Sequence, residues 1–418
     1  MRKGDLPLPE DLRLWRRLAL TQALLGPEIF SMAILVIFFV EYAGFSFSVF
    51  STFTATLFIL NWMLEVPAGA FADKFGRKKC LVAGNTVYVG AIVLLVFAQS
   101  YLSLAFVALM YAVGSCLASG TFQATMYEAF SARQATSQFH SVMAETTGLG
   151  LWGAALAATV GGWLAAYSLA LPLLVDAVAL ALLTLYLLLR MPPASTQAPS
   201  GRVKPSLSIR KMLTSAWRIT LASPTLCVLF AGLAITFACV RASFNAYQPL
   251  MLDAGIPVQY FGVAFCVLVL LGGGVAKIFS KLPKPWLDRG YPELAVIAVF
   301  ILGLLPVALL GMSPIFLLLS VAAHQFVRGV FPSYYSYRIN REIPVGTPAR
   351  TTVLSIANLI RALVTAIAVF GIGGIADDLD LVTAYKWINS LAIAALIALV
   401  IFPRSPGKNV DTPHPSDN

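Results

Sequence analysis

Hydrophobic residues fill most of the chain in long stretches that are separated by short polar joints. In a bilayer the backbone must satisfy its own hydrogen bonds, so an apolar run of about 20 residues predicts a membrane-spanning helix. Twelve such helices are predicted. Their expected ranges are 18–41, 48–71, 80–98, 102–128, 138–166, 169–190, 224–250, 257–281, 292–312, 314–338, 350–375 and 382–402.

One long polar segment divides these helices six and six. It begins at Met191-Pro-Pro-Ala-Ser and is rich in Pro, Ser, Gly and basic residues, which is typical of a linker. A short amphipathic helix is expected within it, near Ile209–Leu221. The polar, Pro-rich end of the chain is expected to be disordered. The predicted organisation is an N-terminal six-helix bundle (1–190), a linker (191–223), a C-terminal six-helix bundle (224–402) and a tail (403–418).

Composition supports a membrane protein. Of the 418 residues, 59% are hydrophobic and 11% charged, and the mean hydropathy is +0.82. Soluble domains carry about 25% charged residues. This chain has too few charges to cover a soluble surface, so we expect lipid to be its main solvent.

The basic residues set the expected orientation. Four of the 29 Lys and Arg residues lie well inside predicted helices, and the others fall in loops or at helix ends on one side of the membrane. Loops rich in Lys and Arg stay in the cytoplasm. We therefore expect both termini and the linker to be cytoplasmic, in a multi-pass protein. This distribution also explains the net charge of +10 without a nucleic-acid partner.

Signals for enzyme chemistry are missing from the sequence. There is no HExxH, GxSxG or phosphate-binding loop, and His occurs only three times. The five Cys residues form no CxxC pair and lie in or beside apolar segments, so they are expected to be buried. We expect no cofactor, no metal and no enzyme activity.

The loop after the second predicted helix carries a recognisable motif. Gly69, Asp73, Gly76 and Arg77 occur in the order Gly-x3-Asp-x2-Gly-Arg, followed by Lys78. This resembles the signature cytoplasmic loop of the major facilitator superfamily, G-x-x-x-D-R-x-G-R-[KR]. The resemblance implies an all-α fold of two pseudo-symmetric six-helix bundles, which as a monomer would transport small molecules by alternating access. The residues expected at its cytoplasmic gate are Gly69, Asp73, Gly76, Arg77, Glu128, Asp288 and Arg289.

Other stretches resemble a bacterial subgroup of that family, many of whose members are labelled as exporters. Ser119-Gly120 followed by Tyr127-Glu128 resembles its "SG…YD" ending, with Glu in place of the usual Asp. Met110 stands where many proton-coupled members have an arginine. The stretch Gly153-x3-Ala157-Ala158-x2-Gly161-Gly162 keeps the small residues of an antiporter motif but lacks its proline. The resemblance favours a proton-coupled exporter of the bacterial cytoplasmic membrane. Uptake of an anionic nutrient or siderophore, and lipid flipping, remain alternatives.

Ionisable residues inside the predicted helices are candidate functional groups, because a charge at mid-bilayer costs about 3 kcal/mol or more. The N-terminal half holds the acids and the C-terminal half the bases. By resemblance, the first, fourth, seventh and tenth helices line the cavity, and helical spacing brings further polar residues onto shared faces. The expected cavity residues are Glu28, Asn61, Arg241, Asn245, Gln248, His324, Arg328, Tyr335, Asn358 and Arg361.

Three carboxyl groups are candidates for proton coupling: Glu28, Glu145 and Asp176. Glu28 is the strongest, because it lies about ten residues, or about 15 Å, into the first predicted helix. A carboxyl group between lipid and an aqueous cavity can exchange protons near neutral pH. For Asp176 a structural hydrogen bond is the competing interpretation, and for His324 it is a satisfied buried histidine. The expected partners are a small-molecule substrate, protons and the lipid bilayer.

Overall fold

The structure is a computed structural model that describes residues 9–119, 121–192, 209–279, 281–343 and 350–401, and these residues are almost entirely helical. The first half contains nine helical elements. They are α1 (Glu10–Leu24), α2 (Leu35–Ile37), the π-helical η1 (Phe38–Tyr42), α3 (Phe47–Phe75), α4 (Arg77–Val96), α5 (Tyr101–Ala118), α6 (Thr121–Ala132), α7 (Thr136–Ala165) and α8 (Leu171–Arg190).

The amphipathic segment predicted in the linker is helical, and a second set of helices follows it. These elements are α9 (Ile209–Ala222), α10 (Pro224–Asp253), the 3-10 turn η2 (Val258–Tyr260), α11 (Phe261–Phe279), α12 (Lys284–Asp288), α13 (Tyr291–Leu310), α14 (Pro314–Glu342), α15 (Arg350–Asp378) and α16 (Leu381–Ile401). Serine side chains cap several of the long helices at their N-termini, for example Ser46 before α3 and Ser313 before α14.

Eleven segments among the described residues are long and apolar enough to cross a membrane. They correspond to the second through twelfth predicted helices. The prediction of one continuous helix over 18–41 is wrong, because the chain leaves the helix after Leu24 and re-enters it only at Leu35. The span predicted over 102–128 matches the candidate span Tyr101–Ala132, within which α5 ends at Ala118 and α6 starts at Thr121.

The break in the first segment has a local cause. Pro27 lacks a backbone N–H, and a residue that precedes proline, here Gly26, is disfavoured in the helical conformation. Glu28 follows with a φ of +58°, a conformation that few residues other than glycine adopt. Residues 25–34 therefore form bends and turns rather than helix.

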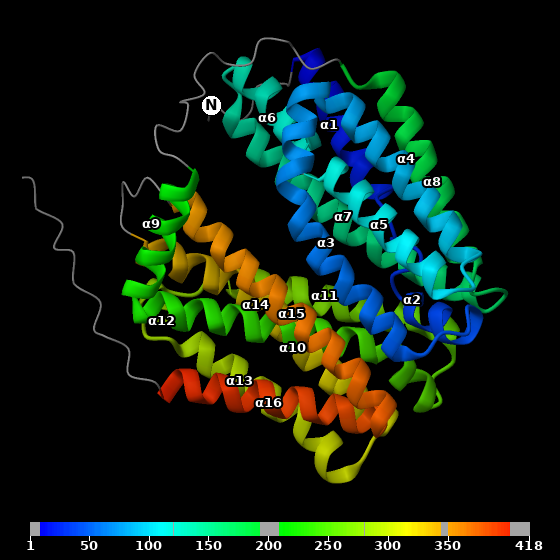
Figure 1. The fold of residues 1–418 in the computed structure, drawn as a ribbon, viewed down its shortest axis with the longest axis vertical. Coiled ribbons are helices and arrows are strands. Elements are labelled where there is room, and N and C mark those ends of the chain that lie inside the picture. The colour runs from blue at the N-terminus through cyan, green and yellow to red at the C-terminus, as the bar shows by residue number, and fades with distance from the viewer. Residues whose placement is uncertain (1–8, 120, 193–208, 280, 344–349, 402–418) are drawn as a thin grey trace, which may run out of the picture.

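The helices form two groups, α1–α8 and α10–α16, called here the N half and the C half (Figure 1). The halves lie close together near α2 and diverge toward α6 and α9 (Figure 1). We call the end near α9 the linker side and the opposite end the far side. The positive-inside pattern described above predicts that the linker side is cytoplasmic.

Close contacts join the two halves near the far side. The Ser48 hydroxyl, at the start of α3, donates to the Asp377 carboxylate at the end of α15. Thr159 of α7 donates a hydrogen bond of 3.5 Å to the backbone carbonyl of Gly262 in α11. A Cβ atom on Gly262 would overlap the carbonyl oxygen of Ala158, so only glycine allows this approach. The far side is therefore closed in this structure.

Candidate functional site

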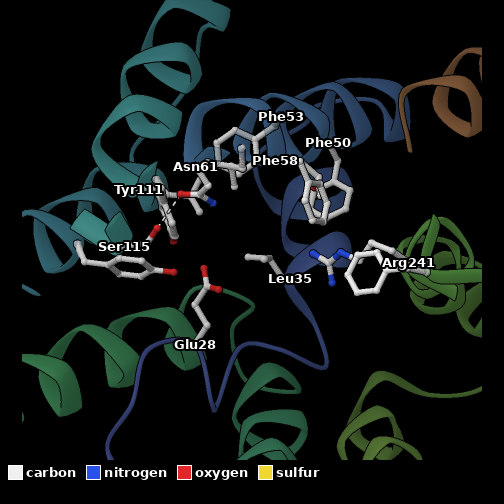
Figure 2. Close-up of a pocket in the computed structure, with 14 residues that line it drawn as sticks. Glu28, Leu35, Phe50, Phe53, Phe58, Asn61, Tyr111, Ser115 and Arg241 are labelled. Carbon is white, nitrogen blue, oxygen red and sulfur yellow. Dashed lines mark hydrogen bonds between the residues drawn. The ribbon is translucent and has the colours of Figure 1, made fainter. Parts of the chain in front are cut away.

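A cavity of about 390 Å³ lies between the halves, and most of its wall belongs to the N half. Helix α3 supplies one continuous face of that wall, because its lining residues follow the helical period of three and four. Helix α10 closes the opposite side (Figure 2). The lining residues are Glu28, Leu35, Phe50, Phe53, Thr54, Leu57, Phe58, Asn61, Tyr88, Leu95, Tyr111, Ser115, Phe237 and Arg241.

Glu28 brings a carboxyl group into this cavity from the broken segment. Its side chain points toward Tyr111 and the other lining residues (Figure 2). Tyr111 in α5 and Tyr88 in α4 line the cavity with it. The break in the helix thus turns a carboxyl group into the cavity, beside two phenol groups of its own half.

Asp176 of α8 holds the broken segment in place. Its two carboxylate oxygens accept hydrogen bonds from the backbone N–H groups of Phe30, at 3.0 Å, and Ser31, at 2.8 Å. The Asp176 side chain is fully buried. Backbone groups that a helix would satisfy internally need such a partner inside a membrane. Asp176, predicted as a proton-coupling residue, does not line the cavity and instead caps this segment.

Gln248 of α10 supports the same segment from the C half. Its side-chain oxygen accepts hydrogen bonds from the N–H groups of Val36, at 2.8 Å, and Ile37, at 3.4 Å. Its amide nitrogen donates to the carbonyl of Met32 at 3.0 Å. Gln248 was predicted to line the cavity. The structure shows it instead as a link between the halves.

Arg241 of α10 faces Glu28 across the cavity, and Leu35 lies between them (Figure 2). Its guanidinium lies over the rings of Phe58, 5.7 Å from the centroid, and Phe244, 5.4 Å from the centroid. Its Nε atom is buried and has no hydrogen-bond partner among the described residues. Arg241 is therefore held by aromatic contacts and keeps hydrogen-bonding capacity for another molecule.

The remaining wall is largely aromatic. Phe58 of α3 meets Phe237 of α10 edge-on, with the ring centroids 6.4 Å apart. The Arg361 guanidinium of α15 lies 4.8 Å from the centroid of the same Phe237 ring. Asn61 accepts a 2.7 Å hydrogen bond from the Ser115 hydroxyl, shown as a dashed line in Figure 2.

The structure thus brings together three of the predicted cavity residues, Glu28, Asn61 and Arg241. The other predicted cavity residues do not line this space. Asn245 and Tyr335 are buried, and Arg328 and Asn358 are exposed outside it. The Arg361 guanidinium contacts Phe237, a residue of the cavity wall.

His324 was predicted to face the transport path, and the structure places it in the core of the C half. Its two ring nitrogens lie 2.7 Å from the Ser320 carbonyl and 2.7 Å from the Asn389 side-chain oxygen. Only 2% of the residue is exposed. Both nitrogens are engaged within the protein, so the interpretation as a satisfied buried histidine is the better one.

Glu145, the third proton-coupling candidate, pairs with Arg16 of α1. The Arg16 Nε donates to the carboxylate at 2.8 Å. Both side chains are more than 40% exposed, and neither lines the cavity. An ion pair between two exposed side chains contributes little to stability, and this one joins α1 to α7 outside the cavity.

Part of the predicted gate is assembled at the linker end of the N half. Arg77 forms a 2.8 Å ion pair with Glu128 of α6. Gly76, with a φ of +94°, is the only residue between α3 and α4, so the motif makes a one-residue turn. Gly69 lies within α3, and Arg289 is exposed after α12. The side chains of Asp73 and Asp288 lie outside the described residues.

The sequence reasoning missed the aromatic cavity residues, including Phe50, Phe53, Tyr88 and Tyr111. A signal for the first two was present, because Phe50, Phe53, Leu57 and Asn61 recur at helical spacing along α3. A weaker signal was present for the two tyrosines, because Tyr111 and Ser115 lie one helical turn apart and Tyr88 follows Asn85 by three residues.

Comparison with known proteins defines the family. The model described as Major Facilitator Superfamily matches residues 18–369. The chain belongs to the major facilitator superfamily. It is therefore a multi-pass membrane transport protein and not an enzyme. No curated protein sequence matches the chain at a significant level.

Solved structures of this superfamily share the fold. The nucleoside transporter NupG has a TM-score of 0.75 and 14% sequence identity, covering 94% of this chain and 98% of its own. A bacterial homolog of the human lysosomal transporter Spinster has a TM-score of 0.66 and 17% identity, covering 94% and 96%. A POT family transporter in complex with 5-aminolevulinic acid has a TM-score of 0.65 and 12% identity, covering 96% and 97%.

Proposed function

We propose that this protein is a secondary active transporter that moves a small organic solute by alternating access and couples that movement to protons through Glu28. The observation that supports this most directly is the position of the Glu28 carboxyl group. It lines a cavity between the halves, where low-dielectric walls and access to water can alternate around it.

The contacts around Glu28 suit a group whose proton occupancy changes with conformation. Tyr88 and Tyr111 approach it from the N half, while Arg241 belongs to the C half. Rotation of the halves would move Arg241 relative to the carboxyl group. A nearer cation favours the ionised carboxylate, and a more distant one favours proton uptake. Movement of the two halves and proton binding would be linked in this way.

The closed far side supports a state in which the cavity faces the linker side. With the linker in the cytoplasm, as the positive-inside pattern predicts, this state would face inward. The small-residue motif of α7 favours export by antiport. Its glycines, however, also have a packing role, because a Cβ on Gly161 would overlap the carbonyl oxygen of Phe30. Uptake of an anionic solute remains the second candidate, since Arg241 offers a cation within the cavity.

Proton coupling can be tested in proteoliposomes that enclose a pH-sensitive dye, with a panel of small organic acids, bases and neutral solutes added outside. We expect at least one solute to drive a proton flux that the Glu28→Gln variant does not show. The proposal is wrong if solutes cross the membrane in the wild type without moving protons. Reversing the imposed pH gradient then gives the direction of coupled transport.

A further inference from the structure

We propose that the cavity binds an organic anion with an aromatic ring, whose carboxylate pairs with Arg241 and whose ring packs among the phenylalanines of α3 and α10. This inference rests on the proposal that the cavity is the transport site. It names the class of solute that the cavity selects.

The charge of the cavity wall points to an anion. Arg241 and Glu28 form no ion pair with each other, and Leu35 lies between them (Figure 2). Glu28 instead faces Tyr111 of its own half. The Arg241 Nε is buried without a partner among the described residues. A buried donor of this kind is costly until an acceptor reaches it. A carboxylate fits, because a planar guanidinium can bind both of its oxygens.

The rings of the wall point to an aromatic body. Phe50, Phe53 and Phe58 line one side of the cavity, and Phe237 lines the other. Aromatic rings pack edge-on or offset against one another, as Phe58 and Phe237 already do. The Arg241 guanidinium lies over Phe58, so a carboxylate bound to it would bring the rest of the solute next to these rings.

The size of the cavity limits the solute. Its volume of about 390 Å³ is near the lower end of the range of about 300–1,000 Å³ for small-molecule pockets. Glu28 disfavours a second negative charge at the other end of the solute, unless it is protonated. These features favour a compact aromatic monocarboxylate over a lipid.

The test compares matched probes on the purified full-length protein at pH 7.5, without a gradient. The acids are benzoate, 3-phenylpropionate and indole-3-propionate. Each is compared with its own amide, which keeps the ring and loses the charge, and 3-phenylpropionate is also compared with hexanoate, which keeps the charge and loses the ring. Dissociation constants are measured by calorimetry, and thermal stabilisation serves as a second readout. We expect at least one aromatic acid to bind about tenfold or more tightly than its amide.

A variant pair assigns the anion to its residue. Arg241→Gln should weaken binding of the acid about tenfold or more and leave binding of the amide unchanged, because glutamine cannot form a charge-assisted pair with a carboxylate. Arg17→Gln, an exposed arginine of α1, is the matched control and should bind as the wild type does. The inference is overturned if the amides or hexanoate bind as tightly as the aromatic acids, or if none of the acids binds. It is also overturned if Arg241→Gln retains acid binding.

The comparison of acid and amide on the wild type does not depend on any variant folding. Binding is also measured without a gradient. Acid binding without solute-driven proton flux would therefore contradict proton coupling alone. Proton flux driven by other solutes, without acid binding, would contradict this inference alone.

Discussion

The side-chain oxygen of Gln248 accepts a 2.8 Å hydrogen bond from the backbone N–H of Val36, and this bond joins the C half to the broken first segment of the N half. The same amide donates to the Met32 carbonyl. One side chain thus satisfies part of the irregular backbone and holds the far side closed. In an alternating-access cycle both bonds must break when the far side opens.

We expect Gln248→Leu to shift the protein toward states that are open on the far side, because leucine cannot replace these bonds. In a variant without native cysteines, Ala33→Cys is a suitable reporter, since Ala33 is 4% exposed in this structure. Membrane-impermeant thiol reagents added on the far side should label it several-fold faster in Gln248→Leu. Gln325→Leu, at a buried glutamine of α14, is the matched control. Equal labelling rates in the Gln248 variant and the control would contradict the proposed link.

Asp176→Asn should lower thermal stability. An amide presents only one acceptor oxygen, so one of the N–H groups of Phe30 and Ser31 loses its partner, at a cost of about 1–3 kcal/mol. Thermal unfolding of the purified variant measures this. Asp378→Asn, at an exposed residue, should unfold as the wild type does. A stable Asp176→Asn protein that has lost proton coupling would instead restore Asp176 as the proton carrier.

Glycines at the far-side contact should not tolerate a methyl group. A Cβ on Gly262 of α11 would overlap the Ala158 carbonyl oxygen of α7, so Gly262→Ala should prevent tight closure of the two halves and slow transport severely. Gly273→Ala lies on the same helix, α11, with nothing near the added atom, and should transport normally. Initial rates of solute uptake into proteoliposomes test the pair. Equal rates for the two variants would mean that closure at Gly262 is not needed.

The topology predicts that the linker and the end of α15 lie on opposite sides of the membrane. Single cysteines at Ser200 and Asp378, in a variant without native cysteines, test this with a membrane-impermeant reagent on sealed vesicles of known orientation. We expect each vesicle orientation to label one position and protect the other. Labelling of both positions from the same side would exclude two six-helix halves with both termini cytoplasmic.

Hydropathy predicted the spanning helices well because a helix that crosses the hydrocarbon core needs a run of about 20 apolar residues. Eleven predicted helices have a matching candidate span. The prediction of one helix over 18–41 was wrong. The signal for a break, Gly26-Pro27, is present in the sequence, but the apolar run around it is long enough to predict a single spanning helix. The break needs Asp176 and Gln248 as partners, and these are brought near only by the folded halves.

The candidate site was predicted only in part, because the partners of its polar residues are also brought together only in the folded protein. Burial of a charge singled out both Glu28 and Asp176, but sequence could not separate a carboxylate that faces a cavity from one that caps a backbone. That distinction depends on which N–H groups lie within about 3 Å. His324 and Arg241 were both expected in the cavity, with a satisfied buried histidine as the competing interpretation for His324. Only the structure shows that His324 has partners at both ring nitrogens, while Arg241 keeps a buried Nε without a partner among the described residues.

Glu28→Gln tests the central claim, proton coupling through the cavity carboxyl group, most directly. Glutamine keeps the size and hydrogen-bonding capacity of the side chain but cannot exchange a proton. Proteoliposomes containing this variant are compared with the wild type and with Glu41→Gln, an exposed glutamate control. Solute accumulation under an imposed pH gradient and solute exchange at equal pH are measured in the same preparation. We expect Glu28→Gln to lose accumulation and keep exchange, with both activities intact in the control. Gradient-driven accumulation by Glu28→Gln at the wild-type level would show that the proton is carried elsewhere.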